Sequence, residues 1–216
     1  MTRTRQQILD DIHSCNIIID QREIFLFPKE DEEKNYELSL EFLKNIRLLE
    51  GINKNQIIIH YLSNGGDCEA ILSIYDVIKT SKCFITILCH GTISSYGLIV
   101  IQASDLRISM PNCNFMFHEG YTGIHKELTN KQSHSWSLYE KNMDKIISDI
   151  FSNRCINSSY FKSKNMTKLA IKKFIKSQTD KYEDWFMTPE QAMYYGFIDD
   201  IIGGKKYKTI DNIKTI

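Results

Sequence analysis

The amino-acid sequence predicts an α/β fold built around a mainly parallel sheet. Short, continuous apolar runs alternate along the chain with stretches in which apolar residues repeat at helical spacing. Alternation of this kind implies right-handed crossovers between parallel strands, and such a sheet is covered by helices. The chain has 216 residues, of which 42% are hydrophobic. This length suits one domain with a substantial core and is short for two.

The first half of the chain contains three strand patterns, each separated from the next by a helix pattern. In the stretch 36–49 the residues Leu38, Phe42, Ile46 and Leu49 share one helical face. Asp67 follows a sharp turn and can cap the next helix. In order, the expected elements are a helix near residues 4–14, a strand at 23–27, a helix at 36–49, a strand at 56–62, a helix after Asp67 and a strand at 83–89.

The second half of the chain is mostly helical. Thr129 with Gln132, and Thr188 with Gln191, fit capping boxes that begin helices. A helix over 130–153 would be ~36 Å long, so it either projects and packs against another subunit or lies across the sheet. The other elements expected here are a helix at 98–103, strands at 105–110 and 114–118, a helix at 168–177, a helix from Pro189 that Gly196 ends, and edge strands at 197–202 and 206–210.

Composition excludes several classes of function. The formal net charge is zero, so we expect neither a nucleic acid nor a membrane surface as a partner. We find no signal peptide, and no apolar run approaches the ~20 residues of a membrane span. The six cysteines are scattered without the spacing of a metal site, which favours a reducing compartment and predicts no metal.

A serine turn at Gly91–Gly97 is the first candidate for chemistry. It lies between an apolar strand and an apolar helix, where free backbone N–H groups favour negative charge. The pair Gly65-Gly66 also follows the carboxyl end of a strand, so both turns should face one crevice. A hydroxyl there can attack a carbonyl while a neighbouring N–H holds the oxyanion. A plain junction capped by Ser94 is the structural alternative.

A nucleophilic serine needs a base and a carboxylate that orients the base. His118 ends the strand at 114–118 and should therefore face the same crevice, whereas His60 lies inside a strand and is expected to be structural. Asp180, Glu183 and Asp184 are the candidate carboxylates in a late loop, and their spacing does not choose among them.

Five segments, in order, resemble the motifs of the Clp protease proteolytic subunit, ClpP, a serine peptidase of the crotonase-like superfamily. They are the first core strand Arg22–Leu26, the glycine turn Leu62–Gly66, the serine turn Gly91–Gly97, the strand Phe115–His118 and the block from Asp184 to Asp199. The resemblance runs from about residue 22 to 203, which is most of the chain.

The resemblance implies the roles of individual residues. Ser95, rather than Ser94, would be the nucleophile. His118 would be the base and Asp184 the carboxylate that orients it. The backbone N–H groups of Gly66 and Tyr96 would form the oxyanion hole. Neither a metal nor a cofactor would take part.

The resemblance also implies the fold and the assembly. The fold would be that of ClpP, with ββα repeats and a projecting handle helix at about 130–153. Residues 1–21 would form an N-terminal segment that in the family makes the axial entry loop, and residues 22–210 the peptidase domain. The protein would be a self-compartmentalising endopeptidase in heptameric rings, single or stacked in pairs. It would cut unfolded proteins or peptides together with an ATP-dependent AAA+ unfoldase, in the cytoplasm or in an organellar stroma or matrix, and a viral origin is compatible.

Four departures from the family pattern bear on this expectation. Asn64 replaces a proline, Tyr96 replaces a methionine, Glu119–Gly123 replaces a segment that begins Gln-Pro, and Glu183 reverses the charge of an arginine at the ring interface. The last two leave open a catalytically inactive structural paralogue within a ring or a viral assembly. An acyl-CoA hydratase or isomerase of the same superfamily would need carboxylates in the crevice instead of this triad.

Overall fold

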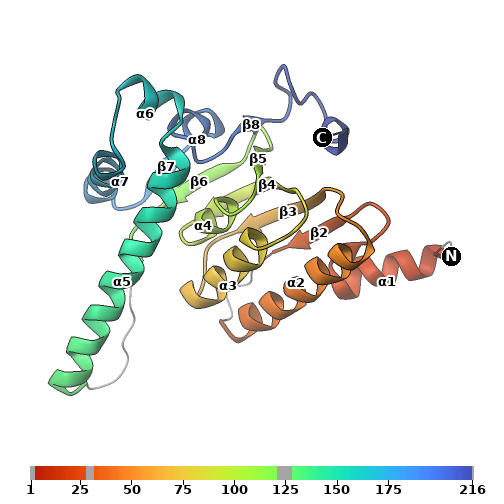
Figure 1. The fold of residues 1–216 in the computed structure, drawn as a ribbon, viewed down its shortest axis with the longest axis horizontal. Coiled ribbons are helices and arrows are strands. Elements are labelled where there is room, and N and C mark those ends of the chain that lie inside the picture. The colour runs from red at the N-terminus through yellow and green to blue at the C-terminus, as the bar shows by residue number, and fades with distance from the viewer. Residues whose placement is uncertain (1–2, 28–31, 121–127, 216) are drawn as a thin grey trace.

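A mixed sheet forms the centre of the molecule in the computed structural model, which describes residues 3–27, 32–120 and 128–215 (Figure 1). Its strand order is β1-β2-β3-β4-β5-β8. The strands of this path are β1 (Ile17–Ile18), β2 (Glu23–Leu26), β3 (Ile57–Ser63), β4 (Ile85–Ser94), β5 (Leu106–Ser109) and β8 (Asp200–Ile201). All neighbours on it are parallel except β1 and β2, so the predicted mainly parallel sheet is confirmed.

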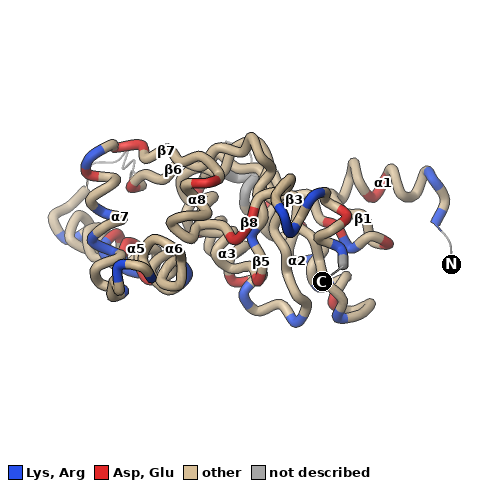
Figure 2. Tube along the Cα trace, turned by 90° about the horizontal axis from the view of Figure 1, so that it is seen from above, with Lys and Arg blue, Asp and Glu red and all other residues tan. Residues whose placement is uncertain are grey.

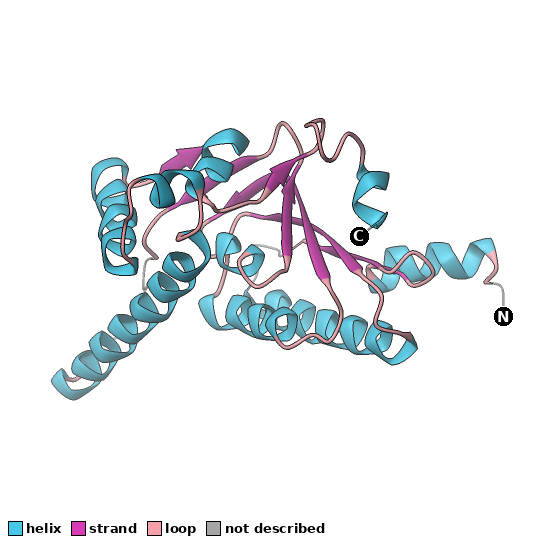
Figure 3. Cartoon of the chain, turned by 45° about the horizontal axis from the view of Figure 1, so that its top comes forward, coloured by secondary structure: helices cyan, strands magenta, loops and turns pink. Residues whose placement is uncertain are grey.

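Helices cover one face of this sheet, and the C-terminal segment covers part of the other (Figure 3). The helices are α1 (Arg5–Cys15), α2 (Glu32–Ile52), α3 (Cys68–Lys79), α4 (Gly97–Ile101), α5 (Asn130–Cys155), α6 (Ser159–Ser163), α7 (Lys168–Tyr182) and α8 (Pro189–Tyr195), and a 3-10 helix, η1, spans Ile210–Thr215.

Side chains of β3 alternate between two apolar clusters, as the two-residue period of a strand requires. Ile57 and Ile59 belong to the large core under α2 and α3. Ile58 points to the opposite face, where it joins a smaller cluster that includes Tyr207 and Ile213. The C-terminal segment is therefore part of the packed domain.

The strand before the serine turn is longer than predicted. The sequence suggested residues 83–89, but β4 continues to Ser94. Its last residues, Thr92–Ser94, pair with β6 (Asn114–Phe117) in parallel, while Ile93 still pairs with Ser63 of β3 beyond an irregularity in that ladder. Gly91 permits the change of direction because its φ of 55° lies in the left-handed region. The predicted turn at 91–97 is therefore shorter than expected.

Helix α5 projects away from the sheet, which settles the alternative that the sequence left open (Figure 1). It has 26 residues and begins at the predicted capping box of Thr129 and Gln132. Its buried residues, Ile147, Phe151, Ser152 and Cys155, all lie in its C-terminal half. The N-terminal half exposes large apolar side chains, among them Trp136 and Leu138.

The C-terminal third contains both a confirmed helix and corrections. Helix α8 begins at the predicted Thr188 cap and ends at Gly196, whose φ is 85°. The edge strand at 197–202 shrinks to β8, and no strand forms at 206–210. There the Gly203 N–H donates to the Tyr207 carbonyl and makes a local turn, so Tyr207 packs into the smaller cluster. Two short elements, α6 and β7 (Trp185–Met187), were not predicted.

The structure tests the remaining predictions only in part. Residues 5–15 form α1, with a capping box at Thr4, as the helix near 4–14 predicted. The boundary between segments 1–21 and 22–210 stays a prediction. Of the segment Glu119–Gly123, residues 121–123 lie outside the described ranges.

Candidate active site

Ser95 lies at the junction between β4 and α4 in a strained backbone conformation. Its φ of 53° is uncommon for a residue with a side chain and is typical of functional turns. Two hydrogen bonds hold the junction: the Ser95 N–H donates to the Met116 carbonyl at 2.8 Å, and the Leu98 N–H donates to the Ser95 carbonyl at 3.1 Å. The serine is thus fixed between β6 on one side and α4 on the other.

The hydroxyl of Ser95 is the first member of a hydrogen-bonded chain of three side chains. The distance from Ser95 Oγ to His118 Nε2 is 2.7 Å, and that from His118 Nδ1 to Asp184 Oδ1 is 3.1 Å. His118 directly follows β6, as predicted. The sequence did not show from the residues alone which carboxylate would lie beside it.

The pairing of β6 with β7 explains why that carboxylate is Asp184. The two strands are antiparallel, and Phe117 lies opposite Trp185. The next residue of one strand and the preceding residue of the other therefore face each other, which brings His118 to Asp184. The other two candidates have different surroundings: Asp180 pairs with Lys176 at 2.8 Å, and Glu183 is the C-cap of α7.

The glycine turn before α3 packs directly against Ser95, so the predicted meeting of the two turns is confirmed. A Cβ added to Gly65 would lie 2.8 Å from the Ser95 Cβ, and Gly65 has a φ of 107°. The hydroxyl of Ser63 accepts the Gly65 N–H at 3.1 Å and braces the turn. Among the described residues we find no hydrogen-bond acceptor for the backbone N–H of Gly66 or of Tyr96.

A thiol near this turn does not compete as the nucleophile. Cys68, the first residue of α3, hydrogen-bonds with Tyr96. Burial raises the pKa of Cys68 to about 11 and, by the same cause, that of Tyr96 to about 12. Because only the thiolate is strongly nucleophilic, Cys68 is inert at neutral pH.

Two other histidines form a separate cluster on the sheet face away from α2 and α3. His60 Nδ1 lies 3.1 Å from His90 Nε2, and His60 Nε2 lies 3.4 Å from Glu23 Oε2. The ring of Phe25 stacks on His60 at 4.8 Å. Burial lowers the pKa of His90. His60 is thus structural, as predicted, whereas the cluster itself was not foreseen.

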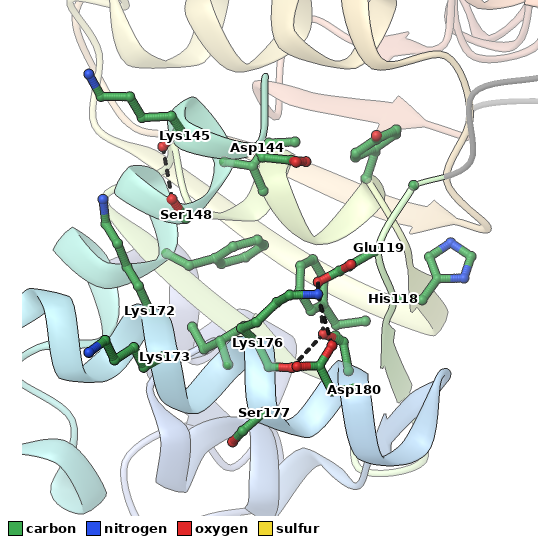
Figure 4. A pocket seen from close by; sticks show the side chains of 17 residues that line it. His118, Glu119, Asp144, Lys145, Ser148, Lys172, Lys173, Lys176, Ser177 and Asp180 are labelled. Carbon is green, nitrogen blue, oxygen red and sulfur yellow. Dashed lines mark hydrogen bonds and ion pairs between the residues drawn. The ribbon is translucent and has the colours of Figure 1, made fainter. Parts of the chain in front are cut away.

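A cavity of about 500 Å³ opens beside His118, the residue that hydrogen-bonds Ser95 (Figure 4). Side chains from the turn at Tyr96, from the end of β6 and from helices α5 and α7 line it. This cavity was not predicted from the sequence. No local sequence pattern indicates the cavity, because α5 and α7 meet only in the folded chain.

Within the described ranges, no group of three or more His, Cys, Asp or Glu side chains could hold a metal ion. Within the same ranges, each helix is too short or too polar to cross a bilayer.

Comparison with known proteins shows which family the chain resembles. The family model of the Clp protease matches residues 5–205. The ATP-dependent Clp protease proteolytic subunit of Deinococcus radiodurans is 29% identical over 158 residues, covering 72% of this chain and 69% of that protein. Proteolytic subunit 1 of Rhodopirellula baltica is 24% identical over 205 residues, covering 94% and 79%.

Solved structures show the same fold. ClpP1 from Listeria monocytogenes superposes with a TM-score of 0.66 at 24% identity, covering 87% of this chain and 94% of that one. A mutant form of the same protein gives 0.65 at 23% identity, covering 91% and 96%. The predicted ClpP fold is confirmed, and the match over nearly the whole chain shows that the protein belongs to the Clp protease family.

Proposed function

We propose that this chain is a serine endopeptidase that hydrolyses peptide bonds in unfolded proteins or peptides. The observation that carries the proposal is the hydrogen-bonded chain from Ser95 Oγ through His118 to Asp184, at 2.7 and 3.1 Å. Membership of the Clp protease family supports the same reaction class.

In the proposed mechanism Ser95 Oγ attacks the carbonyl carbon of the substrate, and His118 Nε2 takes the hydroxyl proton. His118 then gives this proton to the leaving amine as the C–N bond breaks, which leaves an acyl ester on Ser95. A water molecule, activated by the same imidazole, attacks the ester and releases the acid. Asp184 accepts the Nδ1–H bond, orients the ring and stabilises its charged form.

The backbone N–H groups of Gly66 and Tyr96 would hold the oxyanion of each tetrahedral intermediate. Loss of one such donor typically costs ~3 kcal/mol of transition-state stabilisation. The chemistry uses side-chain and backbone groups of this chain alone and calls for no metal or cofactor.

We further propose an assembly in which the subunit works inside a homo-oligomeric ring. The relatives from Deinococcus radiodurans and Rhodopirellula baltica are named ATP-dependent subunits, which supports an AAA+ unfoldase as the partner that supplies unfolded chains. The projecting α5 supports packing between subunits, including stacked heptameric rings. A cytoplasmic or similar reducing compartment fits six cysteines that are all free in the structure.

The first prediction tests the nucleophile. Purified protein should react with a fluorophosphonate probe and release coumarin from peptide amides. Ser95→Ala should do neither, because the attacking oxygen is gone. Ser94→Ala is the matched control and should keep both activities, since the Ser94 hydroxyl bonds Thr92 at 3.0 Å instead. Labelling in the Ser95→Ala protein would overturn the assignment, and an unlabelled wild-type protein would favour the inactive structural paralogue.

A further inference from the structure

The cavity beside the candidate nucleophile has an apolar floor. Phe117, Ile147 and Phe151 line it, and all three are buried in the core. Tyr96 lines the same cavity with its side chain. Since the backbone N–H of Tyr96 would hold the carbonyl oxygen of the acyl residue, that residue's own side chain is the one within reach of the cavity.

Most charges around this cavity are already neutralised by one another. Lys176 Nζ lies 2.6 Å from Glu119 Oε1 and 2.8 Å from Asp180 Oδ1. Lys172 pairs with Asp149 at 2.5 Å. Figure 2 shows both signs of charge along α5 and α7, so neither helix is a uniformly basic surface.

Asp144 of α5 differs from the other two carboxylates that line the cavity, Glu119 and Asp180, because no described residue forms an ion pair with it. Burial raises the pKa of Asp144, and the nearby charges of Glu119 and Glu140 raise it further, while the charge of Lys176 lowers it by a smaller amount. Figure 4 shows its carboxylate directed toward the side of the cavity where His118 lies. The ammonium groups of Lys145, Lys172 and Lys173 lie on the other side, away from His118.

We propose that this cavity binds the acyl-side residue next to the cleaved bond and that Asp144 makes it select a lysine or arginine side chain. This inference rests on the proposed peptidase function. The aliphatic stem of such a side chain would pack on Phe117, Ile147 and Phe151, and its cationic end would reach the carboxylate. Long basic side chains combine in this way an apolar stem with a charged end. The cation would also relieve the repulsion between Asp144 and the two glutamates.

The test compares peptide amides of aminomethylcoumarin that differ only in the residue before the coumarin. Lysine and norleucine have the same straight chain and differ in the ammonium group, so their ratio of kcat/KM isolates the charge. We expect lysine to exceed norleucine by about fivefold, the size of a partly exposed ion pair. Glutamate should be the poorest of the three.

Two variants and a control separate this charge effect from other causes. Asp144→Asn should bring the lysine-to-norleucine ratio close to one, and Asp144→Lys should reverse it and improve cleavage after glutamate. Asp76→Asn removes an exposed carboxylate on α3 that does not line the cavity, and it should keep the wild-type ratio. Fluorophosphonate labelling of each variant verifies that Ser95 and His118 remain assembled.

The possible outcomes distinguish failure of this inference from failure of the proposed peptidase function. A labelled wild-type enzyme that cleaves norleucine as well as lysine, or better, overturns the basic preference and leaves the peptidase assignment standing. An Asp144→Asn protein with an unchanged ratio overturns the role of Asp144. A wild-type protein that is neither labelled nor active on any substrate overturns the peptidase function and this inference with it.

Discussion

Ser95 illustrates how a single residue position is shaped for chemistry. Its left-handed backbone conformation costs of order 1 kcal/mol or more, and the surrounding structure must supply that energy. The bonds to Met116 and Leu98 do so, and glycines remove the side chains that would collide. At Gly97 a Cβ would lie 2.8 Å from Ser63 Oγ, so a side chain at the start of the helix would displace Ser63.

The next prediction concerns Gly65, whose missing side chain makes room for Ser95. Gly65→Ala should lower kcat/KM by roughly 100-fold, because the new methyl group would displace the Ser95 side chain or the adjacent oxyanion donor. Peptide cleavage and the rate of fluorophosphonate labelling measure this change.

Gly203→Ala is the matched control for that variant. Gly203 also has a positive φ, 92°, but an added Cβ there meets nothing within 4 Å. Both variants carry the same backbone strain, about 1 kcal/mol, and only the first has the collision. Equal losses of activity in the two proteins would show that strain, rather than the approach to Ser95, is responsible.

At the scale of elements, short strand pairings position the functional groups. The three-residue strand β7 fixes Asp184 opposite His118, although β7 is too short to stand out in the sequence. The extension of β4 beyond Gly91 positions Ser95 in a similar way, because Ser94 pairs with Met116 and β4 ends immediately before Ser95. The site is thus built at the carboxyl ends of β4 and β6.

An ion pair between the buried Arg107 and the partly exposed Asp199 holds the C-terminal strand against β5. Arg107 donates to Asp199 through Nε at 3.0 Å and Nη2 at 2.5 Å, and to the carbonyl of Gly196 at 2.7 Å. Burial raises the pKa of Asp199, but the hydrogen bonds and charge of Arg107 lower it more, so the net pKa lies below 3.8. The pair therefore stabilises the ionised carboxylate in the folded chain.

This direction of shift predicts how stability depends on pH. A carboxyl with a lower pKa in the folded chain stabilises the fold above its unfolded pKa of about 3.9. That contribution is lost as the pH falls through the folded pKa. Asp199→Asn should lower the free energy of unfolding by roughly 2–4 kcal/mol at pH 7, because it leaves Arg107 buried without its anion. The difference from wild type should shrink as the pH drops below about 4.

Urea unfolding at a series of pH values measures both quantities. Asp149→Asn is the control, because the Asp149–Lys172 pair lies at the surface and should contribute little at any pH. A stability difference for Asp199→Asn that stays constant into acid would contradict the assigned role of the carboxylate charge.

At the scale of the whole molecule, the exposed end of α5 is the feature that a single chain does not explain. Leu138 is 54% exposed and Trp136 42% exposed, and both lie on the half of the helix that extends beyond the sheet. Apolar side chains gathered on a projecting element are typical of an interaction surface. This agrees with the proposed ring, in which a neighbouring subunit would cover them.

The corresponding prediction concerns the native mass of the protein. The wild-type chain should form a homo-oligomer, and Leu138→Glu should shift the native mass toward smaller species, because a charge would be buried at the contact. Leu169→Glu is the matched control, since Leu169 is 63% exposed on α7, and it should leave the mass unchanged. Native mass spectrometry or light scattering decides, and a monomeric wild-type protein would contradict the proposed assembly.

The sequence by itself determined the elements whose signals are local. Apolar spacing over residues 36–49 predicted α2, capping boxes at Thr129 and Thr188 located the starts of α5 and α8, and alternation predicted the parallel sheet. It also placed the serine turn, the glycine turn and His118 at one edge of that sheet. These features depend on residues within a few positions of one another, so they can be read along the chain.

Only the tertiary structure decided how distant segments meet. The pairing of β6 with β7 brings Asp184 to His118 across 66 residues, and α5 and α7 together enclose the cavity that carries Asp144. The projection of α5 was likewise open in the sequence. The physical reason is that a short strand or a polar side chain gains its stability from a partner far along the chain, and local periodicity contains no information about that partner.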